Sequence, residues 1–193
     1  MIQFLDHIDR TLFLFLNGFH NPFFDRVMFD GTKSIIWLPL YLFFLFLVIR
    51  KYKWNTLVVF LFTALLILVS DQLATLVKDL IQRLRPSQQP GLAVHIVEAY
   101  KGGTYGFYSG HASNTFSVAI FLIVLLGRHW YTILPAILWT LFMSYTRIYL
   151  GVHYPGDILA GWIAGAIIGL LIGKVALITI RFLEQKKKNL ASR

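Results

Sequence analysis

Long runs of apolar residues, separated by short polar turns, occupy most of the chain from Ile35 onward. A helix needs about 20 mainly apolar residues to cross the hydrocarbon core of a bilayer. Five runs approach or reach that length, and the shorter ones can draw helical residues from their polar flanks. We therefore predict an all-α, integral-membrane helical bundle of about five transmembrane helices, at Ile35–Ile49, Thr56–Val77, Ser113–Leu126, Tyr131–Ser144 or slightly beyond, and Ile158–Ile180.

The N-terminal segment Gln3–Phe19 has a different pattern, in which charged residues alternate with large apolar ones. Asp6, Asp9 and Arg10 interrupt the apolar positions, as expected of an amphipathic helix lying in the membrane interface. A sixth, tilted span is the alternative. No basic stretch followed by an apolar run opens the chain, so we expect no cleaved signal peptide and a mature chain that begins at Met1.

Composition agrees with a membrane protein, since 57% of the 193 residues are hydrophobic and 14% are charged. The net charge of +9 could indicate nucleic-acid binding, but the basic residues lie at the ends of apolar runs and form no single stripe. We expect the lipid bilayer and a membrane lipid as partners, and no nucleic acid. The absence of cysteine excludes disulfides, thiolate catalysis and cysteine-ligated metals. No repeat or linker divides the chain, so residues 1–193 are expected to form one membrane-embedded domain.

Basic residues cluster in the Arg50–Asn55 turn and in the tail at Lys186–Lys188, and Arg128 lies in a third short turn. The positive-inside rule places these three segments in the cytoplasm. The connections Lys78–Ala112 and Thr146–Asp157 then share the opposite face of the membrane.

These two outer connections contain three groups of polar residues. Lys78 and Arg85 are seven residues apart, so on a helix that continued to Pro86 they would share a face and could hold one anion. Interfacial snorkelling of both side chains is the alternative. Ser109-Gly110-His111 precedes the third span. Ser109 is suited to an N-cap there, and the free N–H groups of a helix start can bind phosphate.

The third group contains Arg147, His153 and Asp157. A carboxylate beside a histidine fixes the imidazole tautomer and stabilises the charge that forms when the other ring nitrogen attacks. Pro155 and Gly156 indicate that His153 lies on a loop and that Asp157 begins a helix, where it could also serve as an N-cap.

A zinc site made by His111, His153 and Asp157 is the alternative chemistry. The cations Lys78, Arg85 and Arg147 argue against it, because converging positive charges repel a divalent metal and attract an anion. Phosphate is therefore the expected ligand, with no metal and no cofactor.

Together these spacings resemble the phosphatidic acid phosphatase type 2 (PAP2) superfamily, which also includes glucose-6-phosphatase and the vanadium haloperoxidases. Its signature is Lys, six residues, Arg-Pro, then Pro-Ser-Gly-His, then Ser-Arg, five residues, His, three residues, Asp. Lys78–Pro86 fits the first motif in full. The other two motifs fit with one departure each, Tyr108 in place of Pro and Thr146 in place of Ser.

The resemblance implies a role for each motif residue. His153 would attack phosphorus and form a phosphohistidine, with Asp157 holding its ring. His111 would protonate the leaving oxygen and then activate the hydrolytic water. The charge on the phosphate oxygens would be neutralised by Lys78, Arg85, Ser109, the backbone amide of Gly110, and Arg147.

The resemblance also implies a multi-pass lipid phosphatase of the bacterial cytoplasmic (inner) membrane, with its active site facing the periplasm or exterior. Undecaprenyl diphosphate or phosphatidylglycerophosphate is the expected substrate. A lipid A phosphatase, or a lipid phosphotransferase using the same site, is the alternative. From another class, an inactive lipid-phosphate binding or transport protein would keep the cations but would not need both histidines and Asp157.

Two further features carry predictions of their own. Asp71 lies inside the second span, where we expect a buried polar contact within the bundle and consider a functional role as the alternative. The Ser87–Phe107 loop, which contains His95 and Glu98, is expected to lie over the site and contact the substrate headgroup.

Overall fold

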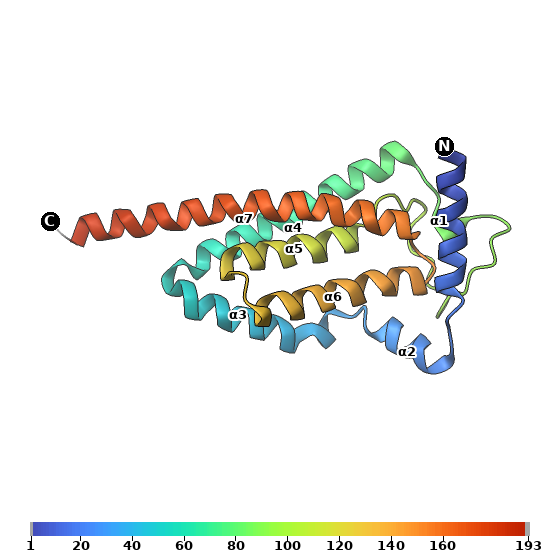
Figure 1. Ribbon diagram of the computed structural model, residues 1–193, viewed down its shortest axis with the longest axis horizontal. Coiled ribbons are helices and arrows are strands. Elements are labelled where there is room, and N and C mark those ends of the chain that lie inside the picture. Colours follow the sequence, from blue (N-terminus) through green and yellow to red (C-terminus); the bar gives the residue numbers. More distant parts are fainter. Residues whose placement is uncertain (1, 192–193) are drawn as a thin grey trace.

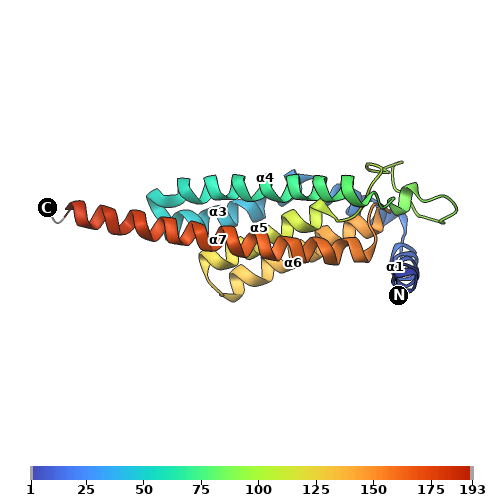
Figure 2. The ribbon, with the colours of Figure 1, turned by 90° about the horizontal axis from the view of Figure 1, so that it is seen from above.

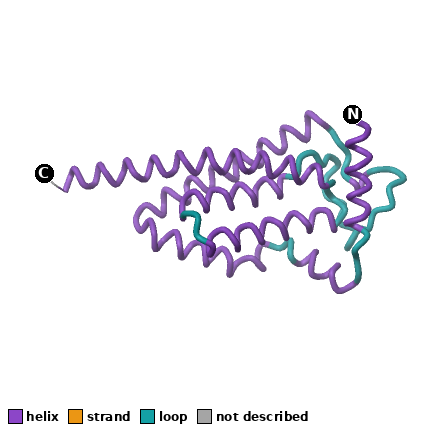
Figure 3. Tube along the Cα trace, viewed as in Figure 1, coloured by secondary structure: helices purple, strands orange, loops and turns teal. Residues whose placement is uncertain are grey.

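The computed structural model describes residues 2–191, and this part of the chain is nearly all helical, without strands (Figure 3). Its α-helices are α1 (Ile2–Asn17), α2 (Pro22–Asp30), α3 (Leu38–Tyr52), α4 (Thr56–Ile81), α5 (Gly110–Leu126), α6 (Trp130–Tyr149) and α7 (Pro155–Ala191). Short 3-10 turns lie at Ser34–Trp37, Lys53–Asn55 and Pro86–Gln88. The predicted all-α fold is confirmed, and the expected start at Met1 lies outside the described residues.

Helices α3 to α7 lie side by side in an elongated bundle, and each holds all or most of one of the five predicted apolar runs (Figures 1 and 2). The helix boundaries differ from the runs. The turn Ser34–Trp37 precedes α3, α5 begins at Gly110, and α7 continues to Ala191. By length and hydropathy, the helical stretches Ser34–Ile81 and Pro155–Leu190 could each cross a membrane. The number of spans therefore stays a prediction.

A seam of small residues joins α5 to α7. A Cβ atom added to Gly165 would lie 2.5 Å from the carbonyl oxygen of Ser113, and one added to Gly161 would lie 2.7 Å from that of Ser109. Only glycine permits this backbone approach, as at other membrane helix contacts that use small residues four apart. The glycines of the seam are Gly161, Gly165, Gly169 and Gly173. The seam fixes the start of α7 against the start of α5.

The N-terminal helix α1 crosses one end of the bundle at a steep angle to its long axis (Figures 1 and 2). Phe13 is fully buried and packs edge-on against Tyr154, whereas Phe4 and Phe15 are exposed. This orientation favours the interfacial helix over the sixth span. Helix α2 was not predicted. Pro22 occupies its first turn, and the Asn21 side chain caps it by accepting a hydrogen bond from the N–H of Phe24.

Candidate active site

A cavity of about 450 Å³ opens at the end of the bundle beside α1, where the two predicted outer connections meet. Six of the eight predicted site residues line it: Lys78, Arg85, Gly110, His111, Arg147 and His153. Asp71, Asn114 and Thr115, and from the loop Tyr100, Gly102 and Gly103, complete its wall. The cavity joins side chains from α4, α5, α6 and both connections.

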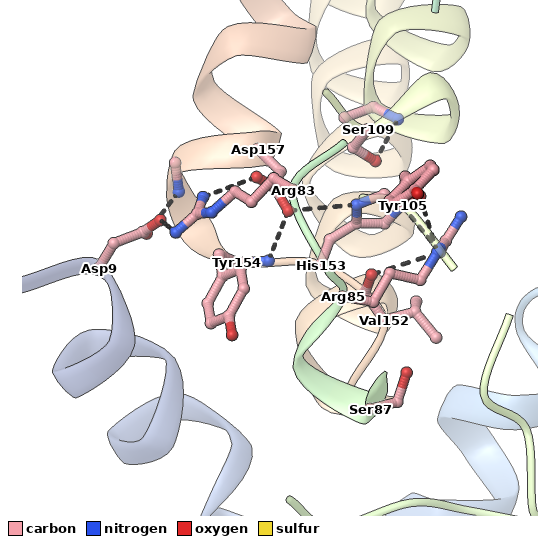
Figure 4. A network of polar contacts seen from close by, with 12 residues as sticks. Asp9, Arg83, Arg85, Ser87, Tyr105, Ser109, Val152, His153, Tyr154 and Asp157 are labelled. Atoms are coloured by element: carbon pink, nitrogen blue, oxygen red, sulfur yellow. Dashed lines mark hydrogen bonds and ion pairs between the residues drawn. The ribbon is translucent and has the colours of Figure 1, made fainter. Parts of the chain in front are cut away.

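The His153 ring is almost fully buried between a carboxylate and a guanidinium (Figure 4). Its Nδ1 lies 3.4 Å from Oδ2 of Asp157, and its Nε2 lies 3.3 Å from Nη1 of Arg85. Because a guanidinium only donates, Nε2 is the acceptor and the ring proton belongs on Nδ1, toward Asp157. Burial lowers the pKa of His153 to about 4, and Asp157 only partly offsets this. The ring is therefore neutral at neutral pH, with a lone pair on Nε2 beside the cavity.

Asp157 is fully buried and holds the start of α7 as well as facing His153. Its Oδ2 accepts a hydrogen bond from the backbone N–H of Tyr154 at 3.0 Å. Since α7 begins at Pro155, Asp157 occupies the third helical position and reaches back to the N-cap residue, as in one half of a capping box. It is not the N-cap itself, but its carboxylate does serve the helix start.

Arg85 reaches the site by a route that differs from the prediction. Helix α4 ends at Ile81 because Gln82 adopts a left-handed conformation, so Lys78 and Arg85 do not share a helix face, and that prediction was wrong. Instead, the backbone of residues 83–85 runs extended beside residues 104–106. Two hydrogen bonds hold it there, from Arg85 N–H to the Thr104 carbonyl at 3.1 Å and from Gly106 N–H to the Arg83 carbonyl at 2.8 Å.

Arg83 is the functional candidate that the sequence analysis missed. Its guanidinium forms ion pairs with Asp157 at 2.8 Å, Asp9 at 2.8 Å and Asp6 at 3.1 Å, and it lies 4.2 Å from the ring centroid of Tyr154. The sequence did contain a signal for Arg83. Arg85 precedes a proline and therefore favours extended backbone, and residues two apart on an extended chain share a face, so Arg83 is expected on the same side as Arg85.

Arg147 is a buried cation with capacity to bind an anion. Its side chain is almost fully buried, and its Nε donates to Oγ1 of Thr146 at 3.1 Å. Its Nη2 has no hydrogen-bond partner among the described residues. A buried guanidinium donor without a partner is costly, and phosphate oxygens would supply the missing acceptors.

The Ser109-Gly110-His111 motif is divided between the cavity and its supporting wall. Ser109 is fully buried, and its Oγ caps α5 by accepting a hydrogen bond from the N–H of Ala112 at 3.3 Å. Its own N–H donates to the carbonyl of Asp157. Gly110 and His111 line the cavity, and the His111 side chain is exposed to it. The positive end of the α5 dipole thus points toward the cavity.

Asp71 does not form the buried contact that was predicted for it. Its side chain is exposed on the cavity wall, where Oδ1 accepts a hydrogen bond from Nδ2 of Asn114 at 2.6 Å. The buried polar contact at this level belongs to Ser70, whose Oγ lies 2.8 Å from Oγ of Ser113. On α4, Ser70 faces the buried side of the helix, and Asp71, the next residue, faces away from it.

The Ser87–Phe107 loop covers the site with other residues than the two singled out from the sequence. His95 packs away from the cavity, where its Nε2 lies 2.8 Å from Oδ1 of Asp25 and its ring stacks on His20. Glu98 does not line the cavity either. Among residues 2–191, no three His, Cys, Asp or Glu side chains gather as metal ligands, and this includes His111, His153 and Asp157.

The family model of the PAP2 superfamily matches residues 53–178, which is more than half of the chain and contains every predicted site residue. The chain belongs to the PAP2 superfamily. The lipid A 4'-phosphatase of Bacteroides thetaiotaomicron is 41% identical to this PAP2 protein over 181 residues, covering 91% of this chain and 80% of the relative. The lipid A 4'-phosphatase of Porphyromonas gingivalis is 33% identical over 186 residues, covering 91% and 76%.

A solved structure shares the fold. The crystal structure of a transmembrane PAP2 type phosphatidylglycerolphosphate phosphatase from Bacillus subtilis superposes with a TM-score of 0.66 at 23% identity, covering 89% of this chain and 85% of that one. The family and its relatives show that the PAP2 protein is a membrane lipid phosphatase. The neighbour shows that its fold is that of a transmembrane helical PAP2 protein.

Proposed function

We propose that this PAP2 protein hydrolyses the phosphate monoester of a sugar lipid of the lipid A type, through a phosphohistidine on Nε2 of His153 and without a metal. One observation carries the mechanism: Nε2 lies at the wall of a cationic cavity, with Arg85 on its cavity side and Asp157 behind the ring. A neutral histidine is an activated nucleophile when the N–H of its second ring nitrogen faces a carboxylate.

The reaction balances with the side chains that line the cavity. As Arg85 turns from Nε2 of His153 to the phosphate oxygens, Nε2 attacks phosphorus in line and the phosphorus–oxygen bond to the lipid breaks. His111, protonated beside the bound phosphate, gives a proton to the leaving oxygen. Asp157 stabilises the imidazolium while the phosphoryl group is attached. Water then attacks phosphorus, His111 takes its proton, the phosphorus–nitrogen bond breaks, and inorganic phosphate leaves. During both steps, positive groups neutralise the equatorial oxygens, namely Lys78, Arg85 and Arg147.

Two findings support a sugar phosphomonoester over undecaprenyl diphosphate, which was expected from the sequence together with phosphatidylglycerophosphate. The two relatives that match over 91% of the chain are lipid A 4'-phosphatases. In addition, Asp71 places a carboxylate on a wall whose other charged side chains, Lys78, Arg85 and Arg147, are cationic. A carboxylate accepts hydrogen bonds from sugar hydroxyls and repels a second phosphate. The cavity therefore suits one phosphate attached to a polyhydroxylated headgroup.

The test measures phosphate released by the purified protein from three lipids: lipid A, undecaprenyl diphosphate and phosphatidylglycerophosphate. We expect lipid A to react fastest and the rate to survive EDTA. His153→Ala should abolish turnover, and Asp157→Asn should lower it strongly. His7→Ala, which changes an exposed histidine on α1, is the matched control and should leave the rate unchanged.

Each part of the proposal has its own contrary result. Near-normal release by His153→Ala would refute the phosphohistidine. Loss of activity in EDTA that zinc restores would refute the metal-free site. Fastest release from undecaprenyl diphosphate would refute the sugar-lipid substrate but leave the proposed mechanism intact. Asp71→Asn, which removes the charge and keeps the shape, should raise the rate on the diphosphate relative to lipid A. An unchanged ratio would show that Asp71 does not select against the diphosphate.

A further inference from the structure

Arg83 contacts Asp157 from behind, outside the cavity that would hold the substrate, and Asp9 in turn contacts Arg83 (Figure 4). Nη1 of Arg83 lies 2.8 Å from Oδ1 of Asp157, and Nη2 lies 2.8 Å from Oδ2 of Asp9. The side chains of Arg83 and Asp9 are mostly buried, and that of Asp157 is fully buried. Nη2 of Arg83 also lies 3.1 Å from Oδ1 of Asp6, which is partly exposed, so the network runs from the surface of α1 to the carboxylate that faces His153.

The spacing of Arg83 and Arg85 matches the two ends of the Asp157–His153 pair. Residues two apart on an extended chain point to the same side at a separation of about 7 Å. Arg83 contacts the outer oxygen of Asp157, and Arg85 contacts Nε2 of His153. The two hydrogen bonds to residues 104–106 hold this segment extended. Two side chains from one short extended segment thus contact the catalytic pair at its two ends.

The ion pair with Arg83 determines which way the Asp157 carboxylate faces. With Oδ1 bound to Arg83, Oδ2 is directed to the Tyr154 N–H and to Nδ1 of His153. Without Arg83, Oδ1 would be a buried anionic oxygen without its cation, which is costly, and the Tyr154 N–H alone would then hold the carboxylate against rotation. Since Nδ1 must face this carboxylate for Nε2 to attack, rotation would misplace the nucleophile.

Helix α1 supports the network through Asp9. While Oδ2 of Asp9 pairs with Arg83, its Oδ1 accepts a hydrogen bond from the backbone N–H of Gly156 at 2.7 Å. A Cβ atom on Gly156 would lie 2.7 Å from Oδ2 of Asp9, so the approach depends on glycine. Asp9 therefore binds both the arginine and the turn that separates His153 from Asp157.

We propose that Arg83 is a positioning residue for the Asp157–His153 pair, and that Asp9 of the interfacial helix α1 holds Arg83 in place. The rate of phosphoryl transfer therefore depends on the packing of α1 across the end of the bundle. This inference rests on the proposed role of His153 as nucleophile. It implies that the site also depends on α1, a helix that contains no residue of the three motifs.

The test compares kcat, KM and the pH dependence of kcat/KM for Arg83→Gln, Arg83→Lys and Asp9→Asn. We expect Arg83→Gln to lower kcat about 10- to 100-fold, the range found for outer-shell groups that orient metal-binding histidines. KM should change little because Arg83 does not line the cavity. Arg83→Lys should recover part of the loss, since one ammonium can still pair with Asp157. Asp9→Asn should lower kcat by a smaller factor.

The pH profile separates positioning from general destabilisation. Removing the Arg83 cation leaves the Asp157 charge to act on His153 alone, so the acid limb of kcat/KM should move to higher pH by about half a unit or more. The charged and titratable groups that otherwise face His153 are unchanged in the variant: Asp157 from α7, Lys78 from α4, His111 from α5, Arg147 from α6, and Arg85.

Two controls make the outcomes decisive. Arg26→Gln, which changes an exposed arginine of α2 outside this network, should leave both kcat and the profile unchanged. His153→Ala runs in the same assay. If that variant is inactive while Arg83→Gln and Asp9→Asn behave as wild type, the positioning inference is overturned and the proposed function stands. If His153→Ala stays active, the proposed function itself fails. Should Arg83→Gln not accumulate in the membrane, Arg83→Lys and Asp9→Asn decide by the same criteria.

Discussion

At the scale of single residues, the site combines full burial with opposed charges around one neutral ring. His153 has the Asp157 carboxylate at Nδ1 and the Arg85 guanidinium at Nε2. Burial disfavours the imidazolium more strongly than Asp157 favours it, so the pKa falls to about 4. The free enzyme thus keeps its nucleophile unprotonated, and charge develops on the ring only when phosphorus is attached.

This low pKa predicts a pH dependence of stability. Between pH 6.5 and about 4, the unfolded chain binds a proton at residue 153 and the folded protein does not. The contribution of His153 is therefore fully present above pH 6.5 and is lost as the pH falls toward 4, by roughly 3 kcal/mol in total. Thermal unfolding in detergent from pH 7 to pH 4.5 should show a smaller acid loss in His153→Gln than in wild type.

His7→Gln serves as the control for that measurement, because His7 is exposed and its replacement should keep the wild-type slope. Equal slopes for wild type and His153→Gln would contradict a neutral buried ring.

The motif spacings predicted six of the twelve residues that line the cavity, because each motif is a short local pattern on one connection. They could not predict Arg83, whose partners lie on α1 and α7 and come together only in the folded chain. Asp71 was misjudged for a related reason. The apolar run showed where Asp71 lies along α4. Whether its side chain is exposed depends on which side of the helix borders the cavity, and the run does not reveal this.

At the scale of elements, hydropathy predicted α3 to α7 because each must present an apolar surface over several turns. It predicted the ends less well, since these depend on local backbone conformation. The expected continuation of α4 to Arg85 failed at Gln82, and the pairing of Leu84 with Tyr105 then replaced helix with extended chain. That pairing joins residues about 20 apart, which periodicity within one segment does not reveal.

The glycine seam between α5 and α7 gives a prediction at this scale. Gly165→Ala places a methyl group 2.5 Å from the Ser113 carbonyl, which is backbone and cannot turn aside, so the two helices must separate. We expect a loss of about 1–3 kcal/mol in stability, as for other overpacked sites, together with lower activity because α7 carries Asp157. Thermal unfolding in detergent and phosphate release measure the two effects.

Gly173→Ala is the matched variant for this test. Its added methyl group would meet the Val124 side chain at 3.0 Å, which can adjust, and it lies four turns of α7 from the site. It should be closer to wild type in both measurements. A Gly165→Ala protein as stable and as active as Gly173→Ala would show that the seam does not limit the approach of the helices.

At the scale of the whole molecule, the basic segments and the cavity lie at opposite ends of the bundle. The α3–α4 turn, the α5–α6 turn and the C-terminal part of α7 are at one end in Figure 1, and the loops around the cavity are at the other. This agrees with the assignment of charge along the sequence, in which Arg50–Asn55 and Lys186–Lys188 are cytoplasmic.

We therefore expect a reporter in the Arg50–Asn55 turn, or fused after Arg193, to read as cytoplasmic, and one in the Ser87–Phe107 loop to read as external. Labelling of intact cells with a membrane-impermeant reagent, before and after permeabilisation, measures this. Labelling of the loop only after permeabilisation would reverse the orientation and move the substrate to the inner leaflet.

The length of α7 links these two ends in a way that concerns the membrane itself. This helix has 37 residues, or about 55 Å at 1.5 Å per residue, whereas the hydrocarbon core is about 30 Å thick. It carries Asp157 in its first turn and Lys186–Lys188 in its last turns, and a continuous helix does not shorten. With the lysines held in water on one side, the height of the catalytic pair on the other side is fixed relative to them. In a thinner or thicker bilayer, the lipid phosphate groups on the side of the cavity would lie at a different height from His153. We therefore expect phosphate release to be fastest in a bilayer whose thickness matches the span of α7.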